Sequence, residues 1–229
     1  MKTLLHIDSS VRRTDNEHPG HNSISKQLGH LFVDTWMNLN HQGNVIHRDL
    51  GLNPPDFITQ DWIAAVFTPE SERNTQQQAL LRLSDVLIDE LEQADLLLIT
   101  APMYNYGMPA VLKAWFDQVI RINKTFSFDL ARGDFPLAPL FRGKTLVLLT
   151  SSGEFGFEPN GIRAHMNHLG PHIETLSHYL GVDSVHKIRS EYQEFADERH
   201  AQSLSQARQS IVELAHQLAG HPSPERSAT

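Results

Sequence analysis

Hydroxyl, amide and aromatic side chains gather in three separate stretches of this 229-residue chain. Hydroxyl groups donate hydrogen bonds to anions, and each bond to a charged group contributes roughly 1.5–3 kcal/mol net. Tyrosine rings and a methionine beside them offer flat, apolar surface. These residue types are suited to binding a flat molecule that carries an anionic group. The three stretches are Ser9-Ser10 with Ser23-Ile24-Ser25, Pro102-Met103-Tyr104-Asn105-Tyr106, and Ser151-Ser152-Gly153-Glu154.

The first stretch joins an expected strand at residues 3–8 to an expected helix at residues 23–39. The free N–H groups and the positive dipole end of a helix start favour an anion by about 0.3–1 kcal/mol. Helix starts commonly carry Asp or Glu in the first turn, but none occurs here before Asp34. The vacant positive end between serines predicts a phosphate monoester site, with Arg12 as an optional contact. Simple capping of the helix by serine and asparagine is the alternative.

The second stretch follows an apolar run at residues 95–100, which is typical of a buried parallel strand. Pro102 ends that run, and Pro109 opens a helical pattern after an aromatic, amide-rich loop. In open α/β sheets, ligands bind just outside the carboxyl ends of the strands. A flat, apolar ligand with polar edges suits such a loop, so these residues point to a flavin. The alternative is a loop that closes the core with incidental aromatic residues.

The third stretch follows another apolar run, at residues 144–150. Gly153 allows backbone N–H groups to approach a ligand closely, although Gly and Ser also mark ordinary turns. If one fold brings the three strand ends together, a single shared site explains all three stretches better than three coincidences.

Apolar runs alternate with helical patterns along the whole chain, which predicts a parallel, doubly wound α/β sheet. We expect a flavodoxin-like architecture of five strands in the order 2-1-3-4-5, with helices on both faces. One domain spans residues 1–219, and residues 220–229 form a flexible tail. The expected strands are residues 3–8, 44–50, 95–100, 144–150 and 184–189. The expected helices are residues 23–39, a short one near Trp62, 73–93, 110–123, part of 161–180, and 195–218.

Charge and composition exclude several classes of function. The formal net charge is −8, whereas a nucleic-acid partner requires a basic surface. The chain has no cysteine, so disulfides, thiolate nucleophiles and cysteine-ligated metals are excluded. It shows no signal-peptide pattern and no apolar run near the ~18 residues of a membrane span. We therefore expect a cytoplasmic protein without membrane or nucleic-acid partners.

With these motifs the chain resembles the FMN-dependent NADH-azoreductases, also described as NAD(P)H:quinone oxidoreductases. The resemblance covers most of the chain, and its more specific parts are Pro102-Met103-Tyr104-Asn105 and the LKAWFDQV segment at residues 112–119. The serine positions, Thr125-Phe126-Ser127-Phe128 and Thr150-Ser151-Ser152-Gly153 extend it.

The resemblance implies a bound FMN at the three stretches. Ser9, Ser23 and Ser25, with the amide of Ile24, would bind the phosphate, and Ser10 lies beside them. Residues 102–106 would lie along the isoalloxazine, with the Asn105 N–H near flavin N5. Ser151, Ser152 and Gly153 would bind the pyrimidine edge, next to Glu154.

The resemblance also implies an activity: hydride passes from NADH or NADPH through FMN to a quinone or azo compound, in a ping-pong reaction without a catalytic side chain. The family is homodimeric, and Phe126 and Phe128 match aromatic positions of a substrate pocket at the subunit interface. The physiological acceptor and the preferred nicotinamide stay open. The alternatives are a flavodoxin-like electron carrier and an acyl-carrier-protein phosphodiesterase, for which no G-x-S-x-G elbow is present.

Two departures from the family pattern stand out. Glu154 follows Gly153 where the family commonly has an Arg-Gly-Gly run, and the first loop is long, with His18 and His21. A carboxylate near the pyrimidine would disfavour a reduced, anionic flavin if it points inward.

Three other patterns carry little weight for the function. His165, His168 and His172 are spaced as on one helical face, but Gly170-Pro171 interrupts that helix, so no metal site is expected. The Gly143-Lys144-Thr145 triplet precedes a strand and is no P-loop. Lys113 and Asp117 are expected to form an i,i+4 ion pair.

Overall fold

Three apolar runs and two more polar edge strands form one five-stranded sheet in the order β2-β1-β3-β6-β7. In the computed structural model, which describes residues 2–220, every pairing between neighbouring strands of this sheet is parallel. The predicted strand order 2-1-3-4-5 is confirmed, since β4 and β5 pair apart from the sheet. The sheet strands are β1 (Thr3–Asp8), β2 (Asn44–Asp49), β3 (Leu96–Pro102), β6 (Lys144–Ser151) and β7 (Val182–Ser190).

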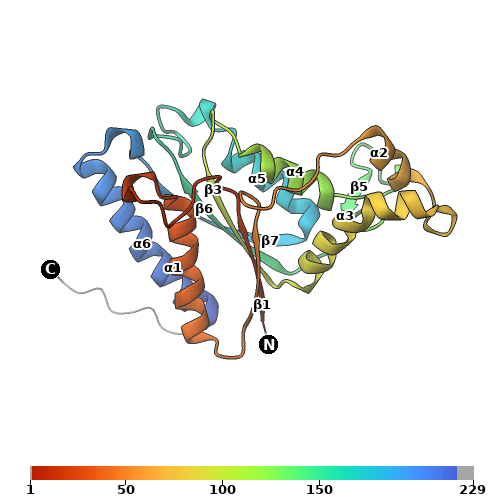
Figure 1. Cartoon of the computed structure of the whole chain (residues 1–229), viewed down its shortest axis with the longest axis horizontal. Coiled ribbons are helices and arrows are strands. Elements are labelled where there is room, and N and C mark those ends of the chain that lie inside the picture. The colour runs from red at the N-terminus through yellow and green to blue at the C-terminus, as the bar shows by residue number, and fades with distance from the viewer. Residues whose placement is uncertain (1, 221–229) are drawn as a thin grey trace.

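Helices cover both faces of the sheet, as predicted (Figure 1). One face carries α1 (Ile24–Leu39) and α6 (Glu198–Ala219). The other carries α3 (Thr75–Gln93), α4 (Ala110–Val119) and α5 (Gly170–Ser177), and α2 (Gln60–Phe67) packs against α3. Single 3-10 turns lie at Pro19–His21, Glu70–Glu72, Leu130–Arg132, Ala164–Met166, His178–Leu180 and Gln193–Phe195.

Side chains alternate along β1 between two apolar cores. Leu4 packs with Phe32 and Trp36 under α1, whereas Leu5 and Ile7 pack on the other face. This alternation also directs His6 and Asp8 to the α1 face, because successive strand residues point to opposite sides. Asp8 ends β1, so the loop that begins at Ser9 leaves the sheet at its carboxyl edge.

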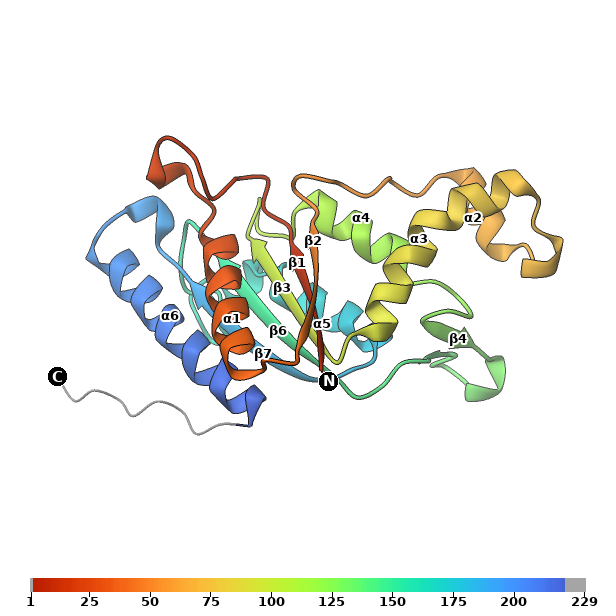
Figure 2. The same ribbon diagram turned by 60° about the horizontal axis from the view of Figure 1, so that its bottom comes forward.

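The helix expected at residues 110–123 ends earlier, at Val119. The hydroxyl of Thr125 accepts the Arg121 N–H and donates to the Val119 carbonyl, and Asn123 adopts a left-handed φ of 61°. The chain therefore turns into an antiparallel ribbon of β4 (Phe126–Phe128) and β5 (Leu137–Pro139). The sequence did not predict this ribbon, which Figure 2 shows apart from the main sheet.

The prediction that His165, His168 and His172 lie on one helical face is wrong. His165 lies in a 3-10 turn, His168 lies in a loop, and His172 lies in α5, which begins only at Gly170. A proline is favourable in the first turn of a helix, so Gly170-Pro171 starts the helix instead of interrupting one.

Most of the expected tail at residues 220–229 lies outside the described residues. Gly220 is described, and it closes α6 with a left-handed φ of 77°. Among residues 2–220, the helices are too short or too polar to cross a membrane.

Candidate functional site

The carboxyl ends of β1, β3 and β6 meet around a polar cavity of about 160 Å³. All three predicted stretches contribute to its lining, so the structure brings them together. An adjoining hollow shares Met103, Gly153 and Glu194 with this cavity. The predicted residues around the cavity are Ser10, Ser23, Ile24, Pro102, Met103, Tyr104, Ser151 and Gly153, and those around the hollow add Asn105, Tyr106, Ser152 and Glu154.

The start of α1 forms the polar end of the cavity. Ser23 caps the helix by accepting the Lys26 N–H at 3.3 Å, and its hydroxyl lies 3.3 Å from that of Ser25. The first turn of α1 holds no acidic residue, as predicted. Arg12 also lines the cavity. Neutral hydroxyl donors around a positive helix end fit a phosphate group.

Ser9 and Ser25 were also predicted to bind the phosphate, but they do not line the cavity. The Ser9 hydroxyl donates to the Thr100 carbonyl at 2.8 Å, and the Ser9 N–H donates to the same oxygen at 3.1 Å. Ser9 therefore ties the first loop to β3, while Ser10 faces the cavity and lies 3.5 Å from the Tyr104 hydroxyl. Ser25 is fully buried.

A tight turn shapes the loop after β3. Tyr104 and Gly107 exchange two backbone hydrogen bonds of 3.0 Å each, and Asn105 and Tyr106 between them have φ values of 48° and 66°. Two successive positive φ values define a type I′ turn, in which asparagine is favoured. The Met103 N–H donates to the Ser151 carbonyl at 2.8 Å, so this loop is fixed to the loop after β6.

The loop after β7 also borders the site, which the sequence analysis missed. The backbone N–H groups of Gln193 and Glu194 donate to the carbonyls of Ser152 and Gly153, at 3.2 and 3.1 Å. A Cβ atom on Gly153 would lie 2.4 Å from the Glu194 Cγ, so glycine lets the Glu194 side chain lie in its present position. The loop has no glycine of its own to signal its sharp path.

The negative charge of Glu154 is paired with the guanidinium of Arg163. Its carboxylate lies 3.0 Å from the Arg163 Nε, and Arg163 also stacks over the Phe155 ring. A hydrogen bond to Glu154 and its negative charge raise the pKa of the Tyr106 hydroxyl. The carboxylate therefore acts on Tyr106 and Arg163 at the rim, with its charge largely balanced.

Phe126 and Phe128 lie on β4, and neither lines the cavity or the adjoining hollow. The Phe126 ring packs against Tyr179 at a centroid distance of 5.8 Å, and Phe128 is half exposed. Within one chain these two residues are not brought together with the other predicted site residues.

The strand order, the carboxyl-edge cavity and the two covered faces define a doubly wound flavodoxin-like protein. The chain belongs to the family described as having a flavodoxin-like fold, whose model matches residues 2–215.

Relatives of this chain carry more specific names. The chain is 65% identical, over 95% of its length and the whole of the relative, to FMN-dependent NADH:quinone oxidoreductase 2 of Colwellia psychrerythraea. It is 38% identical, over 94% of its length and 99% of the relative, to FMN-dependent NAD(P)H:quinone oxidoreductase 1 of Pseudomonas aeruginosa. A solved FMN-dependent NADH-azoreductase from Bacillus anthracis, in complex with FMN, superposes with a TM-score of 0.82 at 16% identity, covering 96% of this chain and all of that one.

Proposed function

We propose that this chain is an FMN-dependent oxidoreductase that takes hydride from NADH or NADPH and reduces a quinone or an azo compound. The observation that carries the proposal is the cavity in which three strand ends place neutral donors at an acid-free helix start, beside Met103 and Tyr104. The names of the relatives at 65% and 38% identity support the same cofactor and reaction.

The residues around the cavity suit the parts of FMN. Ser10, Ser23 and the backbone of Ile24 would hold the phosphate, and Arg12 is within the same lining. Met103, Tyr104 and the Asn105-Tyr106 turn would support the isoalloxazine, with the Asn105 N–H beside N5. Ser151, Ser152 and Gly153 would bind the pyrimidine edge.

The chemistry that bound FMN supplies is acceptance of a hydride and its delivery to an acceptor. The protein contributes binding, orientation and hydrogen bonds. Backbone N–H groups near residues 151–153 would stabilise negative charge on the reduced ring, since fixed donors cost no reorganisation when charge develops. No side-chain acid is required, because water can protonate the product. Nicotinamide and acceptor would use one open face in turn, which is a ping-pong order.

A homodimer would complete the acceptor pocket. The ribbon that carries Phe126 and Phe128 exposes large apolar side chains, among them Leu130 at 74% and Phe135 at 85%. Exposed apolar groups on one segment are typical of an interaction surface. In a second copy this ribbon would bring Phe126 and Phe128 to the flavin of the first. A cytoplasmic location, where NADH is available, fits this activity.

The experiment is an absorption spectrum of the purified protein, followed by steady-state NADH oxidation with menadione. We expect a flavin spectrum and menadione-dependent turnover. A protein that binds FMN but does not turn over would be an electron carrier, which contradicts the proposed enzyme. A colourless protein that does not take up added FMN would contradict the site itself.

A single substitution separates cofactor binding from folding. Ser23→Asp retains a good helix cap, because Asp caps as well as Ser, but adds a negative charge where the phosphate would bind. We expect FMN affinity to fall by about 100-fold or more, which corresponds to ~2.7 kcal/mol, and the Tm of the FMN-free protein shows whether the variant folds.

Thr59→Asp is the matched control, because Thr59 caps α2 in the same way by accepting the Trp62 N–H. Binding of FMN is measured by fluorescence quenching, and riboflavin, which lacks the phosphate, should bind both variants alike. Equal FMN affinity of the Ser23→Asp and Thr59→Asp variants would contradict the phosphate assignment.

A further inference from the structure

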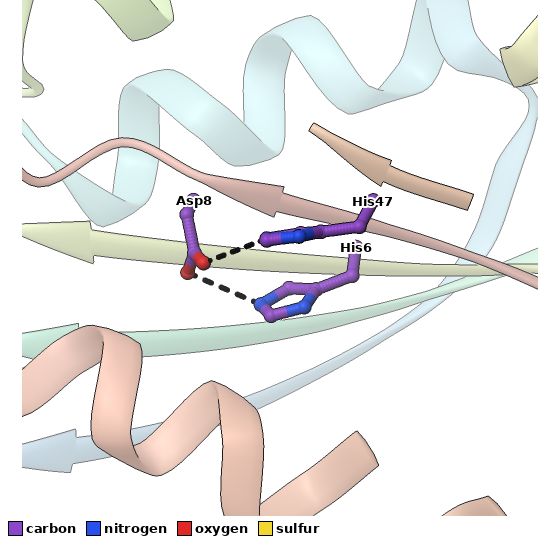
Figure 3. A group of neighbouring side chains, drawn as sticks. All are labelled: His6, Asp8 and His47. Atoms are coloured by element: carbon purple, nitrogen blue, oxygen red, sulfur yellow. Dashed lines mark hydrogen bonds and ion pairs between the residues drawn. The ribbon is translucent and has the colours of Figure 1, made fainter. Parts of the chain in front are cut away.

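Three side chains outside the proposed cofactor site meet between β1 and β2 (Figure 3). His6 and Asp8 share one face of β1, and the parallel register places His47 of β2 directly beside His6. The His6 Nε2 lies 3.1 Å from Asp8 Oδ1, and the His47 Nε2 lies 2.9 Å from Asp8 Oδ2. Both imidazole rings therefore direct a nitrogen at the same carboxylate.

The carboxylate of Asp8 is buried without a permanent cation. Asp8 and His6 are 1% and 2% exposed. In the part of the chain that the structure describes, the ion-pair partners of Asp8 are the two histidines, and Thr100 adds a hydroxyl donor at 2.5 Å. Lys26, the nearby lysine, pairs with Asp49 at 2.6 Å. A buried carboxylate requires compensation, and among the described residues it comes from two imidazoles and a hydroxyl instead of Lys or Arg.

Three side chains converge on the carboxylate of Asp8. The His47 ring, the His6 ring and the Thr100 hydroxyl each lie within hydrogen-bond distance of one of its oxygens. The group therefore presents its two oxygens next to two imidazole nitrogens.

We propose that His6, Asp8 and His47 form a binding site for a divalent transition-metal ion of the Zn²⁺ class, with water as the fourth ligand. Two imidazole nitrogens and one carboxylate oxygen are ligands that Zn²⁺ takes at open sites. Zn²⁺ bonds of about 2.0–2.1 Å in a tetrahedron separate ligand atoms by roughly 3.3 Å. The His6 and His47 nitrogens lie 3.1 and 2.9 Å from the two different oxygens of Asp8, and one ligand atom from each of the three residues lies within 4.8 Å of the others.

The surroundings have the form of a metal site. The Thr100 hydroxyl orients Asp8, as a hydrogen-bonded outer shell orients a ligating carboxylate. Gly29 of α1 packs closely over His6, because a Cβ atom there would lie 2.7 Å from the His6 Nε2. The side chain of His47 is 45% exposed on β2, at the edge of the sheet, so a metal ion can enter from solvent and the ring can rotate to close the nitrogen–nitrogen distance.

The test is a calorimetric Zn²⁺ titration of the full-length protein as purified, after removal of metals with a chelator. We compare wild type with His47→Gln, in which an amide can still hydrogen-bond Asp8 but binds Zn²⁺ poorly. His41→Gln is the matched control, since His41 is an exposed histidine shortly before the same strand. Titrations in two buffers of different ionisation enthalpy measure the protons that binding releases.

We expect wild type and His41→Gln to bind one more Zn²⁺ per chain than His47→Gln, or to bind it about 100-fold more tightly, with proton release and a rise in Tm that His47→Gln lacks. Equal stoichiometry and affinity in all three proteins would overturn the proposal, and the cluster would then be a hydrogen-bonded network only. Tm without Zn²⁺ shows that each variant folds. The result does not depend on FMN or on the proposed reaction.

Discussion

At the scale of single residues, Asn105 shows how the site depends on backbone shape. Its φ of 48° and the φ of 66° at Tyr106 place the turn in the left-handed region, where asparagine and glycine are favoured and β-branched residues are strained. The side chain of Asn105 has no role in the proposed chemistry. The turn itself presents the backbone amide and supports Met103 and Tyr104.

This separation of backbone from side chain can be measured. We expect Asn105→Gly to keep FMN affinity and kcat within about threefold, and Asn105→Val to lose at least about tenfold in affinity, since the strain costs of order 1–3 kcal/mol. Fluorescence titration and the menadione assay report both quantities. Similar losses in the two variants would show that the amide side chain, not the turn, is what matters.

Glu191 gives a prediction on pH. Burial raises the pKa of its carboxyl, and a hydrogen bond from the Phe157 N–H opposes this only in part. As pH rises above the ordinary glutamate pKa of about 4.3, Glu191 therefore keeps its proton longer in the folded state than in the unfolded chain. The free energy of unfolding falls as pH rises from this value through the raised pKa of the folded state.

We expect Glu191→Gln to be more stable than wild type at pH 7, by at most about 1 kcal/mol, and equal to it near pH 4. Urea unfolding at both pH values measures the difference. Glu17→Gln is the control, because it removes the same charge from an exposed loop. A stabilisation of the same size at pH 4 would assign the effect to packing instead of ionisation.

At the scale of elements, α1 packs so closely against the sheet that it has a glycine, Gly29, where helix propensity would favour alanine. A Cβ atom on Gly29 would lie 2.6 Å from the Thr100 Cγ2 and 2.7 Å from the His6 Nε2. Alanine stabilises a helix by about 1 kcal/mol over glycine, but overpacking a core costs about 1–3 kcal/mol.

We therefore expect Gly29→Ala to destabilise the protein by about 1–2 kcal/mol despite its better propensity. Gly170→Ala in the first turn of α5 is the control, since its nearest neighbour would lie at an ordinary 3.7 Å. Chemical denaturation of both variants decides the point. A Gly29→Ala variant as stable as wild type would mean that α1 shifts away from the sheet at little cost.

The sequence predicted the elements whose signals are local. Leucine-rich runs marked β1, β3 and β6, whereas the more polar β2 and β7 gave weaker signals. The alternation of strands with helices implied the order that the sheet adopts. The early end of α4 depends on the Thr125 hydroxyl, and the β4–β5 ribbon consists of three-residue strands without a periodic signal. Gln193 and Glu194 reach the site through a loop whose left-handed residues, Tyr192 and Ala196, are not glycines. The His6–Asp8–His47 cluster needed the register between β1 and β2, which a sequence does not state.

At the scale of the whole molecule, the exposed apolar ribbon predicts the oligomeric state. We expect the double variant Phe128→Glu/Phe135→Glu to convert a dimer into a monomer, because each charge would be buried unpaired in the interface. Light scattering after size exclusion measures the mass, and Ser205→Glu on the exposed side of α6 controls for added charge. A wild-type monomer, or a variant that stays dimeric, would contradict a dimer built on this ribbon.

The organisation of the molecule gathers most of the predicted site residues at one edge of the sheet. Both faces are covered by helices, and the carboxyl ends of β1, β3 and β6 meet at a cavity that the β7–α6 loop also borders. This placement agrees with the general position of ligands in open α/β sheets. We therefore expect this cavity to hold FMN and the bound FMN to be reduced and reoxidised there.

The most direct measurement mixes the FMN-loaded protein with NADH under anaerobic conditions and then adds menadione, following the visible flavin absorption. We expect NADH to bleach this absorption and menadione to restore it, in two separate steps with one NADH consumed per FMN. We also expect the Ser23→Asp variant, carrying little FMN, to show neither change. A bound flavin whose absorption NADH leaves unchanged, or a reduced flavin that menadione does not reoxidise, would contradict the proposed reaction.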